Sequence, residues 1–91
     1  MPFVYILESL KDGQFYTGST IDLCKRLQEH NAGRTPSTKY RRPMKLVYFE
    51  EFESLGAARV REKALKQVKA GREKKALVAS FPPEKLLPFS N

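Results

Sequence analysis

Five side chains of this sequence have types and spacings that suit chemistry on a phosphate ester: Tyr5, Tyr16, Arg26, His30 and Glu62. The two tyrosines are eleven residues apart, the arginine follows ten residues later and the histidine four after that. An arginine can clamp phosphoryl oxygens with paired N–H donors, and a carboxylate can hold Mg²⁺. A tyrosine becomes a general base where neighbours lower its pKa from about 10. Together these types suit phosphodiester hydrolysis.

Each of these residues also has a purely structural interpretation. Tyrosines on strands usually pack half-buried, and a histidine near a helix C-terminus is stabilised by the helix dipole. Arg26 can pair with Asp22 or Glu29 on its own helix surface. Glu62 can pair in the same way with Arg59 or Lys66. Taken singly the structural interpretations are favoured, and taken together the five residues favour the chemical one.

Two stretches near the start of the chain predict a hairpin. Residues 2–9 alternate in apolar character, and residues 14–19 follow a tight-turn signal at Asp12-Gly13. A turn centred there places Tyr5 opposite about Thr20. By the same register Tyr16 lies opposite about residue 9, so the two rings are not direct partners but can approach across one face.

Gly18 predicts the end of the second strand and a close backbone approach. A helix is predicted over residues 21–32, with Thr20 as its cap and Asp22 in its first turn. Asn31-Ala32-Gly33 is a stop signal.

Two pairs of residues four apart divide this helix into faces. Leu23 and Leu27 predict its core stripe, whereas Arg26 and His30 share another face. Cys24 points away from the Arg26 face and is predicted to be a packing residue.

The remaining chain predicts a basic loop, a strand and two helices, at residues 34–44, 45–52, 55–69 and 72–80. Ser54 is a candidate cap for the first of these helices and Gly71 its terminator. The fold class is therefore α/β (α+β), a three-stranded antiparallel sheet flanked by helices in the order β-β-α-β-α-α. We expect one domain over residues 1–80 and a tail over 81–91, packed as extended chain or partly disordered.

Helical spacing over 55–69 predicts one broad apolar arc, made of Ala57, Val60, Ala64, Leu65 and Val68. Glu62 falls at the edge of this arc, where a carboxylate can line a cleft. Arg61 falls inside the arc, and the sequence offers no explanation for it.

The net charge of +7 is unevenly distributed. Residues 34–45 carry five basic residues and no acid, and residues 59–75 carry eight basic residues against two acids. Such an arrangement suits a polyanion such as DNA, although a solvated lysine-rich helix face gives the same pattern. The basic residues expected to hold phosphates are Arg34, Lys39, Arg41, Arg42, Lys63, Lys66 and Lys69.

Phe3-Val4-Tyr5 and Tyr16-Thr17-Gly18 resemble the two motifs of the GIY-YIG nuclease superfamily, and the resemblance extends over residues 2–78. Only the tyrosine of the first motif is kept, and the second motif is closer. The chain resembles the small stand-alone bacterial branch of this superfamily.

The resemblance implies a role for each residue. Tyr5 matches the GIY tyrosine and Tyr16 the YIG tyrosine. Arg26 matches the helix arginine and His30 a histidine found in many members. Glu62 matches the glutamate that binds one divalent ion, Mg²⁺ or Mn²⁺.

The sequence also departs from the family pattern. Many members carry an asparagine after the glutamate, whereas this region holds Lys74 and its neighbours, and the only later asparagine is Asn91.

The leading hypothesis is a divalent-metal-dependent endonuclease acting on DNA, with structured (branched), damaged or single-stranded forms as candidate substrates and RNA not excluded, and with Tyr5 as its base. His30 would position a phosphate or relay a proton. A non-catalytic nucleic-acid-binding module on the same fold is the alternative that the missing asparagine favours. A protein-interaction adaptor using the apolar tail is a third.

Several classes are not indicated. No stretch approaches a membrane span, the N-terminus lacks the pattern of a signal peptide, and one cysteine cannot form an intramolecular disulfide. No Cys/His cluster suggests zinc. We expect a cytoplasmic, reduced protein.

Overall fold

The alternating residues near the N-terminus form the central strand of the sheet in the computed structural model, which describes residues 1–89. β1 (Phe3–Ser9) lies between β2 (Phe15–Thr20) and β3 (Met44–Glu51), and both pairings are antiparallel. Because a central strand is covered on both faces, residues 4–7 are all at most 1% exposed. β2 is an edge strand, so its outer side is open to a ligand.

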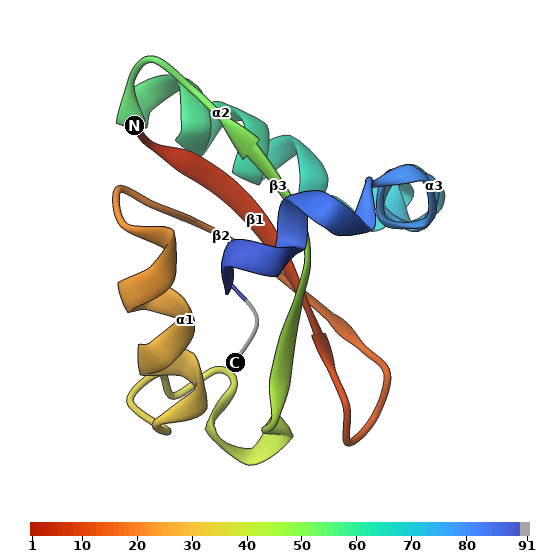
Figure 1. Ribbon diagram of the computed structural model, residues 1–91. Helices are drawn as coiled ribbons and strands as arrows, with labels where there is room; N and C mark the ends of the chain where they lie inside the picture. The colour runs from red at the N-terminus through yellow and green to blue at the C-terminus, as the bar shows by residue number, and fades with distance from the viewer. Residues whose placement is uncertain (90–91) are drawn as a thin grey trace.

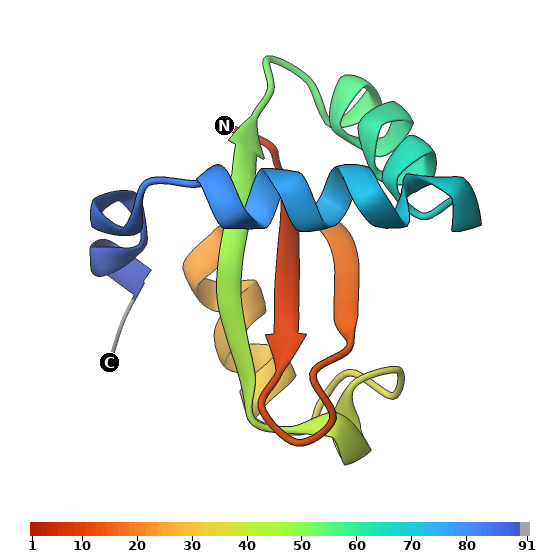
Figure 2. The ribbon, with the colours of Figure 1, turned by 90° about the vertical axis from the view of Figure 1, so that its right-hand side faces the viewer.

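Helices cover both faces of this sheet (Figures 1 and 2). α1 (Leu23–Asn31) lies on one face, and α2 (Leu55–Leu65) and α3 (Gly71–Ser80) lie on the other. Short 3₁₀ segments complete the chain: η1 (Lys39–Arg41), η2 (Val68–Ala70) and η3 (Pro83–Phe89). The predicted fold class and order of main elements are confirmed. Within residues 1–89, none of the helices has the length and apolar character of a membrane span.

The hairpin register differs from the prediction by two residues. Tyr5 pairs with Gly18, and Tyr16 pairs with Leu7. The turn is centred earlier than Asp12-Gly13, because the Ser9 hydroxyl accepts hydrogen bonds from the backbone N–H groups of Lys11 and Asp12. A shift of two residues leaves each side chain on its face, so the two tyrosines share a face as diagonal neighbours.

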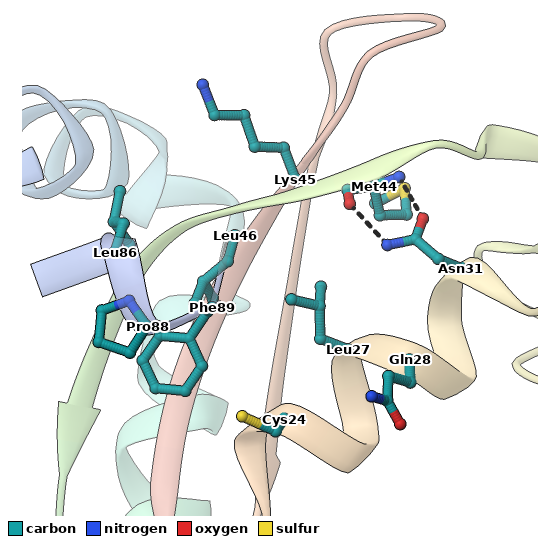
Figure 3. Close-up of a pocket in the computed structure, with 10 residues that line it drawn as sticks. All are labelled: Cys24, Leu27, Gln28, Asn31, Met44, Lys45, Leu46, Leu86, Pro88 and Phe89. Atoms are coloured by element: carbon teal, nitrogen blue, oxygen red, sulfur yellow. Dashed lines mark hydrogen bonds between the residues drawn. The ribbon is translucent and has the colours of Figure 1, made fainter. Parts of the chain in front are cut away.

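Asn31 joins the end of α1 to the start of β3. Its side chain donates to the Met44 carbonyl at 2.9 Å and accepts from the Met44 N–H at 2.8 Å (Figure 3). At the other end of the helix, Asp22 is the cap and accepts from the Lys25 N–H. The prediction that Thr20 caps the helix is wrong by two residues; its hydroxyl instead accepts from the Asp22 N–H. Gly33, with φ +79°, follows the helix end as expected.

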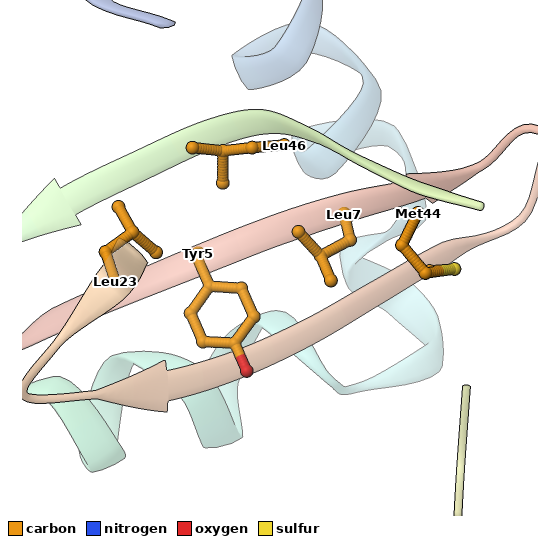
Figure 4. Close-up of a cluster of buried hydrophobic side chains, with 5 residues drawn as sticks. All are labelled: Tyr5, Leu7, Leu23, Met44 and Leu46. Carbon is orange, nitrogen blue, oxygen red and sulfur yellow. The ribbon is translucent and has the colours of Figure 1, made fainter. Parts of the chain in front are cut away.

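Side chains on the two faces of β1 belong to separate apolar clusters. On the α1 face, Tyr5 and Leu7 pack with Leu23, Met44 and Leu46 (Figure 4). On the opposite face there are two clusters. In one, Val4 packs with Ala58 and Leu65. In the other, Ile6 packs with Val47 and Tyr48.

α2 begins at its predicted Ser54 cap, but its predicted end is wrong and its predicted apolar arc is correct at Leu65 alone. The helix ends at Leu65 because Gln67 is extended, and Gly71 begins α3 instead of ending α2. Val60 and Val68 are exposed by 73% and 99%. The buried side of the helix is instead made by Ala58 and Leu65.

Arg61 lies on this inward side because it has acidic partners there. Its guanidinium pairs with Glu50 of β3 at 3.0 Å and with Glu73 of α3 at 3.3 Å. One side chain therefore joins three elements, which explains a charged residue that the helical pattern alone did not.

The tail packs, as expected, but as a 3₁₀ helix and not as extended chain. Leu86 and Phe89 pack against the α1-face cluster, and the Phe89 ring lies 5.4 Å from that of Phe49. Residues 90–91, including Asn91, lie outside the described residues.

We predict that Phe89→Ala lowers the free energy of unfolding by about 2 kcal/mol, less than full loss of a buried phenylalanine because the ring is half-buried. Urea unfolding followed by circular dichroism measures this change. Leu87→Ala is the matched control, since Leu87 is exposed on the same segment and should change stability by less than about 0.5 kcal/mol. Equal losses in both variants would contradict the packing.

Candidate active site

A row of hydrogen bonds runs from α1 through the Tyr5 phenol to the loop before η1. The Tyr5 hydroxyl lies 2.9 Å from His30 Nε2, and His30 Nδ1 lies 2.8 Å from the Thr38 hydroxyl. The Arg26 Nε–H donates to the Tyr5 oxygen at 3.4 Å. Arg26 and His30, which lie one helical turn apart on α1, thus both contact the hydroxyl oxygen of Tyr5.

Matching donors to acceptors assigns the protons in the row. Arg26 can only donate, so the Tyr5 O–H is directed to His30 Nε2, which accepts. A neutral imidazole with an accepting Nε2 carries its proton on Nδ1, which then donates to Thr38. His30 is 0% exposed, so it positions Tyr5 and is not placed to touch a phosphate, which was one of its two expected roles.

Burial holds both partners in their neutral forms. It raises the pKa of Tyr5 from 10.0 to about 12, opposed by the Arg26 hydrogen bond and reinforced by the charges of Tyr16 and Glu62. Burial also lowers the pKa of His30 from 6.5 to about 4, and the charge of Arg26 acts in the same direction. Without a bound cation, Tyr5 is therefore a weak base at neutral pH.

Tyr16 and Gly18 complete the α1 side of the site. The Tyr16 ring lies 4.9 Å from the His30 ring and 6.4 Å from the Tyr5 ring. A Cβ on Gly18 would lie 2.5 Å from the Tyr5 hydroxyl oxygen. Only glycine therefore leaves room for the phenol, which confirms the predicted close approach at this position.

Arg26 also takes part in one of its expected surface pairs, with Glu29 at 3.1 Å. This pair and the bond to Tyr5 hold the guanidinium half-buried. The hydrogen bond to Tyr5 raises the pKa of Arg26 further, against the effect of burial. It stays positively charged at any relevant pH.

Glu62 reaches β2 from the opposite face of the sheet. Its carboxylate accepts a hydrogen bond from the Ser19 hydroxyl and pairs with Lys66 at 2.7 Å. Burial acts to raise the pKa of this carboxyl, but the hydrogen bonds from Lys66 and Ser19 and the surrounding positive charge hold it below its usual 4.5. Glu62 is therefore ionised at neutral pH.

Four of the five predicted residues, Tyr5, Tyr16, Arg26 and His30, lie together on the α1 side of the edge strand, and Glu62 lies on the α2 side. Tyr16 and Gly18 face α1, whereas Ser19 faces α2, because neighbouring strand residues point to opposite faces. Lys66 joins the two sides: its ammonium pairs with Glu62 and lies 5.8 Å from the centre of the Tyr16 ring.

The residues present fit a divalent cation held by a single carboxylate. Within residues 1–89, no cluster of three or more His, Cys, Asp or Glu side chains is placed to hold a metal. Mg²⁺ commonly uses one or two carboxylates, with water and substrate phosphate as its other ligands. The Lys66 ammonium beside Glu62 shows that this carboxylate accepts a cation.

Two of the predicted phosphate-binding residues, Arg41 and Lys66, pair with acidic side chains. Arg41 is half-buried, pairs with Asp12 at 3.4 Å and donates to the Phe15 carbonyl, so the structure gives it a role in holding the hairpin. Lys66 is engaged with Glu62. The others are exposed: Arg34, Lys39, Arg42, Lys63 and Lys69.

Sequence reasoning missed Thr38 and Ser19, the partners of His30 and Glu62. Ser19 directly follows the second motif, which is a usable signal, whereas nothing in the sequence distinguishes Thr38 from its neighbours. Cys24 was predicted to pack but is exposed. It borders a cavity of about 510 Å³ between α1, β3 and η3, which contains none of the five site residues (Figure 3).

We predict that Gly18→Ala displaces the Tyr5 ring and breaks its hydrogen bond to His30. The Tyr5 hydroxyl cannot move away from the added Cβ without breaking its hydrogen bonds to both Arg26 and His30. NMR titration of the His30 ring should show its pKa moving from about 4 back toward 6.5. Gly71→Ala is the control, because a Cβ there meets no atom within 4 Å. A His30 titration in Gly18→Ala unchanged from that of the wild type would contradict the argument.

We also predict that His30 makes stability depend on pH. Between pH 6.5 and about 4, the unfolded chain binds a proton at this histidine and the native chain does not. Stability therefore rises with pH across this window and is lost on acidification, by roughly 3 kcal/mol. Urea unfolding at about pH 7.5 and about pH 4.5 should show a smaller difference for His30→Asn than for the wild type. The same difference in both proteins would exclude this role.

Comparison with known proteins agrees with this geometry. A family model described as the GIY-YIG catalytic domain matches residues 1–75. UPF0213 proteins of Streptococcus pyogenes serotypes M3 and M1 are each 43% identical over 84 residues, which is 91% of this chain and 90% of theirs. The solution NMR structure of a UPF0213 protein from Bacillus halodurans matches with a TM-score of 0.57 and 36% identity, covering 93% of this chain and 92% of that one. The chain therefore belongs to the GIY-YIG family, a family of nucleases.

Proposed function

We propose that this protein is a divalent-metal-dependent endonuclease that hydrolyses phosphodiester bonds in DNA. The observation that carries the proposal is the contact of Arg26 with the Tyr5–His30 pair on one side of β2, with Glu62 bound to Ser19 of the same strand on the other side. Burial is the main cause of the raised pKa of Tyr5, and the charge of Glu62 acts in the same direction. Members of the family generally depend on a divalent cation.

Each residue has a role that its contacts support. Arg26 binds the phosphoryl oxygens and stabilises the charge that grows on them. Tyr5 would act as a phenolate, with its own proton lost to solvent and its negative charge stabilised by the Arg26 N–H, and the phenolate then accepts a proton from the attacking water. His30, neutral and buried, holds the phenol in place, and Tyr16 assists beside it by hydrogen-bonding the water or phosphate.

Glu62 is the group that would hold Mg²⁺ or Mn²⁺. The bound cation would supply positive charge that lowers the pKa of nearby acids and neutralises phosphoryl oxygens. Lys66 must leave the carboxylate when such an ion binds, and its side chain is then free to contact the DNA backbone.

The exposed basic residues support a polyanionic substrate. Arg34, Lys39 and Arg42 follow α1, and Lys63 and Lys69 lie along α2 and η2. The two groups flank the site from both sides of the sheet. Release of counterions by these side chains would give binding that weakens steeply with salt.

A non-catalytic nucleic-acid-binding module is the second candidate. The Lys66–Glu62 pair favours it, because an ammonium already neutralises the proposed metal ligand. Lys74 of α3, in the region where many family members carry an asparagine, favours it too. The protein-interaction adaptor was suggested by the apolar residues of the tail. This support is removed, because Leu86 and Phe89 pack against the core.

We predict cleavage of labelled DNA in Mn²⁺ and none in EDTA, with single-stranded, duplex, flap and four-way-junction substrates compared. Tyr5→Phe, Arg26→Ala and Glu62→Gln should each lose roughly 10²-fold in rate. Glu84→Gln, on the exposed side of η3, is the control and should cleave like the wild type. Salt-sensitive binding of every substrate without cleavage would establish the non-catalytic module instead.

A further inference from the structure

A basic hollow lies beside η1, near the end of the hydrogen-bonded row. It has a volume of about 510 Å³ and is lined by Lys11, Asn31, Lys39, Tyr40, Arg42 and Pro43. Three of these six residues are cations and none is an acid. Tyr40 is 76% exposed, so one aromatic ring of this small domain stands uncovered between positive charges.

The cations are held around the tyrosine by backbone contacts. The Lys11 ammonium donates to the Tyr40 carbonyl at 3.1 Å, and the Arg42 Nε–H donates to the Lys39 carbonyl at 2.7 Å. The Lys39 ammonium lies 5.5 Å from the centre of the Tyr40 ring. The charged ends of Lys11, Lys39 and Arg42 thus lie close to the Lys39–Tyr40 segment.

These three cations lack acidic partners. Within residues 1–89, neither Lys11, Lys39 nor Arg42 forms a salt bridge, and Asp12, the nearest acid in sequence, is paired with Arg41. An uncompensated positive hollow attracts phosphate. An exposed ring beside it offers a flat apolar surface, on which a nucleic-acid base can stack.

The hollow is joined to the candidate active site by a short piece of chain. Thr38, whose hydroxyl bonds to His30, directly precedes η1, and its carbonyl accepts from the Arg41 N–H. Tyr40 is therefore two residues from the end of the row that begins at Arg26. In the complex proposed below, a strand with a phosphate at Arg26 extends toward this surface.

We propose that this hollow binds one unpaired nucleotide of a DNA strand, with the base stacked on Tyr40 and the flanking phosphates held by Lys11, Lys39 and Arg42. In a duplex the base faces are covered by neighbouring pairs, whereas an unpaired base is free to stack. Resting on the proposed nuclease function, the inference names its substrate class: DNA with a single-stranded segment beside the bond that is cut.

The chain contains no tryptophan, so Tyr40→Trp places a single fluorescent reporter in the hollow. We predict that a short oligothymidylate, titrated in EDTA, quenches this fluorescence saturably and binds about tenfold more tightly than a hairpin duplex of equal length. Leu87→Trp, at an exposed position on η3, is the matched control and should not be quenched. Tyr40→Ala should lose the single-strand preference, measured by anisotropy of a labelled oligonucleotide, and Tyr40→Phe should keep it.

The outcomes separate this inference from the proposed function. Absence of quenching in Tyr40→Trp, or equal affinity for single strand and duplex, overturns the inference even if the protein cleaves DNA. Quenching with a single-strand preference, but without cleavage of any substrate in Mn²⁺, supports the nucleotide site and refutes the nuclease. Equal quenching of the Leu87→Trp control would show adherence to the whole basic surface and would also overturn it.

Discussion

The hydrogen bond between Tyr5 and His30 is the interaction on which the rest of the site depends. A buried phenol and a buried imidazole each need a partner, because an unsatisfied polar group in the core costs about 1–3 kcal/mol. Each satisfies the other, and Thr38 satisfies the second nitrogen of the imidazole. This pairing holds α1 against β1, fixes the loop before η1 and aims the phenol oxygen at Arg26.

The sheet turns this interaction into a site. Burial of β1 on both faces makes it a rigid base, and β2 beside it has a free outer edge. Because adjacent β2 residues face opposite layers, Tyr16 reaches the α1 side while Ser19 reaches Glu62 on the α2 side. Arg61, tied to β3 and α3, keeps α2 in the position that this contact requires. The two helices α1 and α2, on opposite faces of the sheet, thereby both place side chains beside the edge strand β2.

Much of this arrangement could be predicted from local patterns, and the failures have physical causes. Strand alternation and residues four apart on a helix placed Tyr5, Arg26 and His30 correctly, since both depend on fixed backbone periods. The apolar arc of α2 was correct at Leu65 but wrong at Val60, which is exposed, and at Val68, because the helix ends at Leu65. Arg61 could not be explained from the sequence because its acidic partners lie on other elements, β3 and α3. Thr38 was missed for the same reason: its importance comes from a partner brought close by the fold.

The central claim is that Tyr5 and Glu62, from opposite faces of the sheet, act on the same phosphate. A double-mutant cycle on single-turnover DNA cleavage in Mn²⁺ tests it most directly, using Tyr5→Phe, Glu62→Gln and the double variant. The account predicts that the double variant is about as slow as the slower single variant, because residues that act as one unit are not additive. Losses that multiply in the double variant would contradict a shared site.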